Sequence, residues 1–357
     1  MNTQELLANY AIGERNFSGI DLSWANLKQV DLPAADFWEA DLSDADLSQA
    51  NLAGTRFNAA SLTRTNLTAT ILTAADLRST DLSDATLDGA NLQGALYDRT
   101  TRFPVNFDPA IASAYLIAPQ SLLQKAILAQ TDLSGADLSE ADLRHANLQY
   151  ATLFGVSLSH ANLSTAALQN AALHEADLLK ANLGGANLTH AKLTYASLQY
   201  ANLSSTVLAH ADLTGANLWK ANLFGADLRT ATLTAANLQG AVYDSRTQFP
   251  ADYNPEQYGA YLIAPHVSLK HADLRGVTLS GADLTGADLT EANLTSADLW
   301  GANLMQANLT GANLTSTNLW GANLTETTLS GATLTDTNLQ AADLTDAVLD
   351  EIGLIDT

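Results

Sequence analysis

Leucine recurs at every fifth position over most of this sequence, and that interval limits the fold more than any other feature. The series is unbroken over residues 128–238 and 269–349, and over residues 22–92 only Phe37 and Phe57 replace leucine. Alanine usually stands two positions before the leucine, aspartate or asparagine directly before it, and serine or threonine directly after it. The fold must therefore offer an equivalent environment to every fifth side chain.

Neither regular secondary structure offers such an environment. On an α-helix, a step of this length turns by about 140°, so the leucines would spiral around the cylinder. In a straight strand, an odd interval sends successive leucines to opposite faces. A short extended piece fits, because its first and third side chains point the same way and place alanine and leucine inward. The remaining residues turn the chain, and repeated turning predicts a solenoid whose coils stack about 4.8 Å apart.

The stretch ADLTGANLWKANLFGADL, residues 211–228, resembles the pentapeptide-repeat family, whose motif is A(D/N)LXX. The resemblance covers roughly residues 16–356 apart from two interruptions, and several stretches look like cyanobacterial members. It implies an all-β solenoid, namely a right-handed, quadrilateral (four-sided) β-helix with 20 residues per coil. The leucine interval alone leaves the number of sides open. With four repeats in each coil, we expect about 14 coils, each rising about 4.8 Å.

Two proline-rich segments, residues 97–123 and 243–269, interrupt the leucine series. They align without gaps at an offset of 146 residues, which indicates an internal duplication. Proline removes ladder donors, so neither segment can form an ordinary coil, and each is expected to be a loop packed on the outside of the stack. Two interpretations stay open, a loop that contacts a partner or an adaptor between coils. The predicted domains are a helical cap (1–15), three repeat blocks (16–96, 124–242 and 270–357) and these two interruption loops.

The two ends of the chain differ. Asn2 and Glu5 suit a helix start and Gly13 suits its end, so we expect a short N-terminal helix that covers the first coil and its strand edges. The C-terminal stretch LDEIGLIDT, residues 349–357, has no evident helical cap. Either its last residues fold over the end, or two columns meet there. The sequence therefore leaves a monomer and an end-to-end homodimer through the C-terminal coil as alternatives.

Sequence motifs for chemistry are missing. There is no cysteine, and no phosphate-binding loop, zinc-protease, serine-hydrolase or dinucleotide fingerprint occurs. His190 and His210 stand 20 residues apart and would be neighbours, but without a third strong ligand two solvated histidines are favoured over a weak metal pair. A convex wall does not separate the pKa values of two carboxyls as catalysis requires. We therefore predict no catalytic, cofactor-binding or metal site, and no enzyme.

Two sets of outward positions are candidates for contact with a partner. A column at 20-residue spacing in the middle block combines lysine, histidine and tyrosine, which is typical either of a contact surface or of an ordinary solvated face. Two tryptophans in the last block would stack, either as exposed anchors or as packing at a corner. The candidate contact residues are His160, Lys180, Tyr200, Lys220, Trp300 and Trp320.

The charge of the chain restricts its partners. The net charge is −22, which disfavours direct binding to nucleic acid. The sequence has no secretory signal and no run of roughly 20 apolar residues, so a cytoplasmic protein is expected, without a membrane span. We predict a protein-interaction scaffold or regulator with a protein partner of unknown identity. The alternative comes from the resemblance, since one branch of the family mimics duplex DNA and binds DNA gyrase; the diluted carboxylates of residues 311–339 speak against it.

Overall fold

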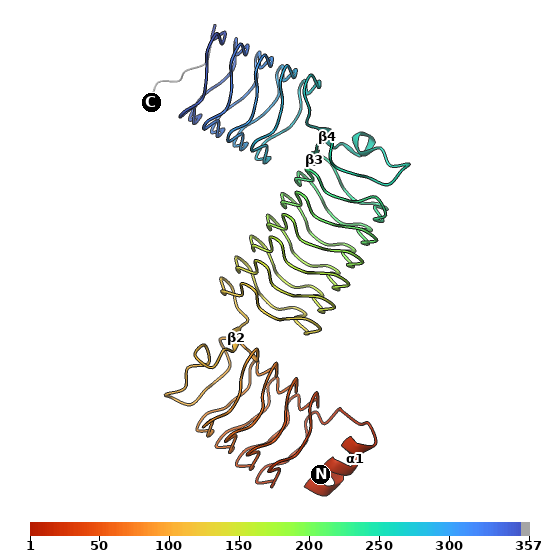
Figure 1. The fold of residues 1–357 in the computed structure, drawn as a ribbon, viewed down its shortest axis with the longest axis vertical. Coiled ribbons are helices and arrows are strands. Elements are labelled where there is room, and N and C mark those ends of the chain that lie inside the picture. Colours follow the sequence, from red (N-terminus) through yellow and green to blue (C-terminus); the bar gives the residue numbers. More distant parts are fainter. Residues whose placement is uncertain (351–357) are drawn as a thin grey trace. The chain divides into compact units, whose positions relative to one another are not determined.

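The computed structural model describes residues 1–350 of the chain. It divides the chain into two compact units, Met1–Leu128 and Ala129–Thr357. Each unit is a stack of coils, as Figure 1 shows. No helix of the described part is long and apolar enough to cross a membrane.

The coil length follows from the register of the parallel bridges. Asn162 bridges to Asn182, Asn182 to Asn202, and Asn202 to Asn222, so equivalent residues lie 20 positions apart. Four such ladders run side by side, one for each five-residue repeat of a coil. Each extended piece is so short that it forms an isolated bridge, and in residues 1–350 the regular strands lie only at the edges of the two interruptions. The predicted β-solenoid is thus confirmed in its coarse form.

The turns between the extended pieces use a left-handed residue. In a typical repeat, the N–H group of Ala161 donates to the carbonyl of Leu158 at 3.0 Å, and His160 between them has a φ of 59°. This conformation favours glycine or asparagine, yet many other residue types adopt it here because two coil neighbours fix the backbone. The residue at this position points outward, which decides where large side chains of the repeat are displayed.

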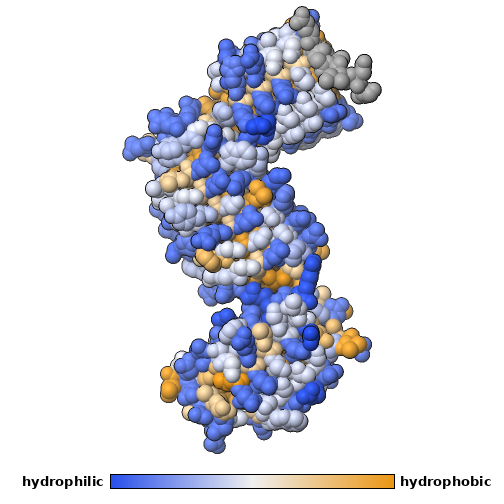
Figure 2. Space-filling model, turned by 180° about the vertical axis from the view of Figure 1, so that it is seen from behind, coloured by the Kyte–Doolittle hydropathy of each residue, from blue (hydrophilic) through white to orange (hydrophobic). Residues whose placement is uncertain are grey.

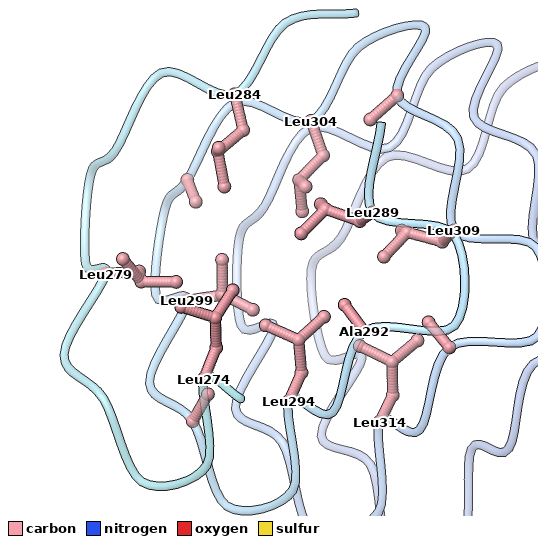
Figure 3. Packing of buried hydrophobic residues seen from close by; sticks show 14 of the residues in the cluster. Leu274, Leu279, Leu284, Leu289, Ala292, Leu294, Leu299, Leu304, Leu309 and Leu314 are labelled. Carbon is pink, nitrogen blue, oxygen red and sulfur yellow. The ribbon is translucent and has the colours of Figure 1, made fainter. Parts of the chain in front are cut away.

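The interior is filled by leucine and alanine, as predicted. Leucines 20 residues apart, such as Leu274, Leu294 and Leu314, stand one behind the other and point into the same interior (Figure 3). Their exposed fractions are close to zero. Burial of each such side chain contributes about 1.5–3 kcal/mol before the entropy of ordering is subtracted. The side chain at every fifth position therefore supplies the core.

Phenylalanine replaces leucine on one side of the first unit. Phe17, Phe37 and Phe57 are buried and stack with ring centroids 5.7 Å apart. The stack continues to Tyr10 in helix α1 (Thr3–Ala11), whose hydroxyl donates to the carbonyl of Pro33 at 2.7 Å. The core of this unit therefore extends into the helix.

Helix α1 begins where the sequence predicts it. The Asn2 side chain accepts a hydrogen bond from the Glu5 N–H at 2.9 Å, which satisfies one of the free donors of the first turn. Leu6 is fully buried in the same cluster as the first coil leucines. The helix thus packs its apolar side against the first coils of its own unit.

Each interruption is bracketed by a short parallel strand pair. The strands are β1 (Leu96–Tyr97) with β2 (Tyr115–Leu116), and β3 (Val242–Tyr243) with β4 (Tyr261–Leu262), and the 3₁₀ helix η1 (Pro255–Tyr258) precedes β4. Between the strands, Phe103 and Phe107 stack at 5.3 Å in the first copy, and Phe249 and Tyr253 stack at 5.8 Å in the second. These aromatic pairs hold equivalent loops in the two copies.

Candidate protein-interaction surface

The predicted tryptophan pair is exposed and ordered by its neighbours. Trp300 and Trp320 have exposed fractions of 51% and 37%, and their rings are stacked with centroids 5.7 Å apart and an interplanar angle of 1°. The backbone N–H of Trp300 donates to Asp298 Oδ1 and the backbone N–H of Trp320 donates to Asn318 Oδ1, each at 3.2 Å. The Asn318 amide also donates to Asp298 Oδ1 at 2.8 Å. The ladder beside the rings therefore fixes the turns that display them.

The predicted column of the middle block changes character along its length. His160 and Lys180 are exposed, Tyr200 is half-buried and Lys220 is buried. The Lys180 ammonium lies 6.0 Å from the centre of the Tyr200 ring, and that ring meets Trp219 edge to face at 4.9 Å. Only the first half of this column is therefore displayed as the sequence predicts.

Lys220 makes an internal contact that the sequence analysis missed. Its Nζ donates to Asp273 Oδ1 at 2.8 Å and to the Arg275 carbonyl at 3.0 Å, and lies 5.1 Å from the centre of the Trp219 ring. The residue is 3% exposed. A Cβ on Gly240 would lie 2.9 Å from Lys220 Cγ, so this glycine makes room for the lysine stem. Lys220 thus joins the coils before the second interruption to those after it.

Asp273 is shared between two cations. The Arg275 guanidinium donates to both carboxylate oxygens at 2.8 Å, and Lys220 donates to one of them. Partial burial raises the pKa of the Asp273 carboxyl, but the hydrogen bonds that it accepts outweigh this effect. The hydrogen bonds from Arg275 first, and from Lys220 second, hold the pKa of Asp273 well below its usual range. The carboxylate therefore stays charged over the whole neutral and mildly acidic range.

A groove of about 510 Å³ lies beside this contact, between coils that precede and follow the second interruption. Asparagine amides of the predicted ladder form part of its lining, and Asn202 Nδ2 donates to Asn182 Oδ1 at 2.9 Å. Lys180 and Tyr200 line another side. Partial burial raises the pKa of the Tyr200 hydroxyl, which therefore stays protonated as a hydrogen-bond donor at neutral pH.

Other exposed aromatic side chains were not singled out from the sequence. Trp24, Tyr150 and Tyr195 have exposed fractions of 76%, 58% and 67%. All three occupy the left-handed turn position, with φ values near 60°. Their position in the five-residue motif was a usable signal, because most side chains at that position are exposed, although Lys220 at the same position is buried. Hydrophobic residues on the face seen in Figure 2 are scattered rather than joined in one large patch.

Histidine and carboxylate groups do not gather into a metal site in the part of the chain that the structure describes. His190 and His210 do stack as expected for neighbouring rungs, with centroids 4.7 Å apart. Within residues 1–350, no third histidine or carboxylate joins this pair to make a group that could hold a metal ion.

Carboxylates are diluted along the ladders. Among the isolated bridges of residues 1–350, only that of Asp21 with Asp41 joins two acidic residues. Elsewhere, asparagine, serine or threonine separates the carboxylates, as in the ladder Asp283–Asn303–Asn323–Asp343. The walls therefore do not carry continuous rows of negative charge.

The family model of pentapeptide repeats matches residues 20–58, 60–96, 121–159, 146–185, 157–194, 173–209, 211–242, 272–311 and 312–350. The solved structure of alr5209 from Nostoc PCC 7120 is 41% identical over 32% of this chain and 95% of its own, with a TM-score of 0.32. No curated protein matches the sequence significantly.

Two further solved structures are similar at lower identity. HetL from the cyanobacterium Nostoc sp. strain PCC 7120, which is involved in heterocyst differentiation regulation, is 26% identical over 100% of this chain and 98% of its own, with a TM-score of 0.25. QnrB1, a plasmid-mediated fluoroquinolone resistance protein, is 16% identical over 62% of this chain and 89% of its own, with a TM-score of 0.22.

Proposed function

Because the chain belongs to the pentapeptide repeat family, we propose that it is a non-enzymatic scaffold or regulator that binds a partner protein on its outer walls. Leucine and alanine side chains fill the interior of the coils, so a partner can contact only the outward side chains of the ladders and turns. The observation that carries this proposal is the exposed, parallel pair of Trp300 and Trp320. Exposed tryptophans that their own backbone holds in place are typical anchors of protein interfaces.

The surroundings of this pair favour a basic partner. Residues 271–357 carry 12 acidic residues and one basic residue, Arg275. Complementary charge steers association and selects partners, and the tryptophan rings can also bind cationic side chains on their faces. His160, Lys180 and Tyr200 form a second candidate contact area, whereas Lys220 would contribute through its internal ion pair.

Purification of partners with the native proteome tests this proposal. The chain should retain a specific protein, and substitution of both tryptophans (Trp300→Ala with Trp320→Ala) should abolish retention without changing the circular dichroism. Trp24→Ala is the matched control, since this exposed residue lies in the other unit and should leave retention unchanged. Retention that survives the double substitution would contradict the assignment of the surface.

The DNA-mimic alternative requires rows of neighbouring carboxylates, and the dilution of aspartate by asparagine and threonine argues against it. We therefore expect no inhibition of DNA gyrase in a supercoiling assay at micromolar protein. Inhibition that depends on Asp21 and Asp41, the one pair of bridged carboxylates in the described residues, would favour the mimic instead.

Several finer features of the fold are also proposals. We expect right-handed coils, about 14 in number at about 4.8 Å each, and three repeat blocks that arose with the duplicated interruptions. The contacts of Leu6 and Tyr10 support a capping role for α1. A cytoplasmic location, and the choice between monomer and end-to-end homodimer, stay predictions. How the C-terminal stretch ends the column falls on residues 351–357, which lie outside the described residues.

A further inference from the structure

Each interruption leaves part of one coil without a following coil. In the regular stack, a ladder residue bridges to the residue 20 positions ahead. Within residues 1–350, Thr86 and Asn91 in the first unit, and Thr232 and Asn237 in the second, bridge only to the preceding coil. The chain leaves the stack after each of these coils and rejoins it at β2 or β4 (Figure 1). An extended edge is therefore open beside each loop.

Backbone groups at these edges lack partners. Among the described residues, the N–H groups of Leu87 and Gly89 and the carbonyl of Ala85 have no hydrogen-bond partner. The same three groups are unpaired in the second copy, at Leu233, Ala235 and Ala231. Unpaired N–H and C=O groups of a strand edge are a template for another extended chain.

The preceding coil shows what the missing chain would do. The N–H groups of Leu67 and Ala69 donate to the carbonyls of Thr86 and Asp88 at 2.9 and 2.8 Å, and the Thr86 N–H donates to the Thr65 carbonyl at 3.0 Å. Three consecutive residues, Thr86 to Asp88, thus satisfy two donors and one acceptor. The unpaired groups at Ala85, Leu87 and Gly89 have this same spacing.

A groove opens in front of each edge. The first has a volume of about 510 Å³ and lies between residues 85–89 and 104–107. The second has a volume of about 600 Å³ and lies between residues 231–235, 250–253 and Tyr258. Both loops leave room for a peptide at the place where the next coil would stack.

The grooves have an apolar floor and an aromatic wall. Leu87 and Leu233 are 8% and 6% exposed, whereas the regular coil leucine Leu67 is fully buried. The walls are Phe107 in the first copy and Tyr253 in the second. The Tyr253 hydroxyl is buried and has no hydrogen-bond partner.

We propose that each groove binds an extended peptide segment of a partner protein, which adds to the open coil edge as a short parallel strand. The segment needs a free N–H at its first bonded residue, which excludes proline, and an apolar side chain at the next residue to cover the leucine floor. Asp88 in the first groove and Asp252 in the second favour a basic flank. Because both grooves lie outside the tryptophan surface, peptide binding here does not depend on the partner contact proposed above.

A synthetic peptide of the sequence Lys-Ala-Asn-Leu-Thr-Lys tests this proposal, since it copies one repeat and adds the basic flanks. The probe is titrated into the ¹⁵N-labelled full chain. The amide signals of Leu87, Gly89, Leu233 and Ala235 should shift, and their hydrogen exchange should slow. A peptide with an N-methylated asparagine lacks the donor to the Ala85 carbonyl or its counterpart, and should bind about five- to tenfold more weakly.

Charge reversal provides the matched controls. The double variant Asp88→Lys with Asp252→Lys should weaken binding about three- to fivefold. Asp336→Lys reverses an exposed charge away from both grooves and should leave binding unchanged. The proposal is overturned if the four amides fail to shift at millimolar peptide, if the N-methylated peptide binds equally well, or if these amides are already protected in the free protein.

Discussion

Removing the carboxylate of Asp273 should destabilise the second unit more than removing the ammonium group of its partner Lys220. The two side chains are unequally buried, at 42% and 2% exposed. Asp273→Ala leaves a buried ammonium with only the Arg275 carbonyl as a close acceptor. A stranded buried charge costs about 3–5 kcal/mol, and the remaining carbonyl reduces this to about 2–4 kcal/mol.

The reverse substitution is milder for a geometric reason. Lys220→Met keeps the unbranched stem that packs beside Trp219 and Gly240, and Asp273 keeps both hydrogen bonds from Arg275. The two hydrogen bonds of the ammonium group are lost, but no buried charge is left unpaired, so the net cost is about 1–2 kcal/mol. The expected difference between the two variants is therefore about 1–2 kcal/mol.

Urea unfolding followed by circular dichroism measures this difference, with hydrogen exchange to locate it. Midpoints are compared rather than extrapolated free energies, since a repeat array need not unfold in two states. Asp44→Ala, which breaks the ion pair with Arg64, is the control and should move the midpoint less, because the Arg64 side chain that loses its partner is 56% exposed. If Lys220→Met destabilises the chain as much as Asp273→Ala, the account of a stranded ammonium is wrong.

Three further predictions concern the core, a turn and pH. Leu203→Ala should lower the free energy of unfolding by about 2–5 kcal/mol, measured by urea unfolding, whereas Lys180→Ala should change it little. Gly240→Ala should lower the melting temperature more than Gly301→Ala, because both have positive φ but only Gly240 would place a Cβ against Lys220. Many aspartates accept hydrogen bonds from the serine or threonine two residues ahead, which lowers their pKa. Their stabilisation is present above the unfolded pKa and lost as the pH falls through the lower folded pKa, so melting temperatures should drop below about pH 4.

The core could be predicted from the sequence because one interval repeats without exception over long stretches. Each leucine such as Leu203 meets the same environment, so a single argument covers all of them. The 20-residue register needed the family resemblance, since a repeat of five residues does not determine how many sides a coil has. Once that register is known, the stacks of Trp300 with Trp320 and of His190 with His210 follow from counting.

The contact of Lys220 with Asp273 could not be predicted in this way. The two residues are 53 positions apart and the second interruption lies between them, so counting in steps of 20 does not bring them together. The same applies to the two grooves, because they depend on where each loop leaves the ladder. Sequence periodicity describes the walls of the coils, whereas the chain's irregular contacts arise where the period stops.

The duplicated interruptions show which of these irregular contacts are shared. At the offset of 146 residues, Ala74 and Ile127 stand where the second copy has Lys220 and Asp273, so the first copy cannot form that ion pair. The groove is different, because both copies keep the leucine floor, the proline that opens the loop and an aromatic wall. A loop that served only as an adaptor between coils would need a joining contact such as the ion pair more than it would need an open strand edge. The open edge is shared by both copies, as are the strand pairs and the aromatic pairs, and it is the shared feature from which peptide binding is proposed.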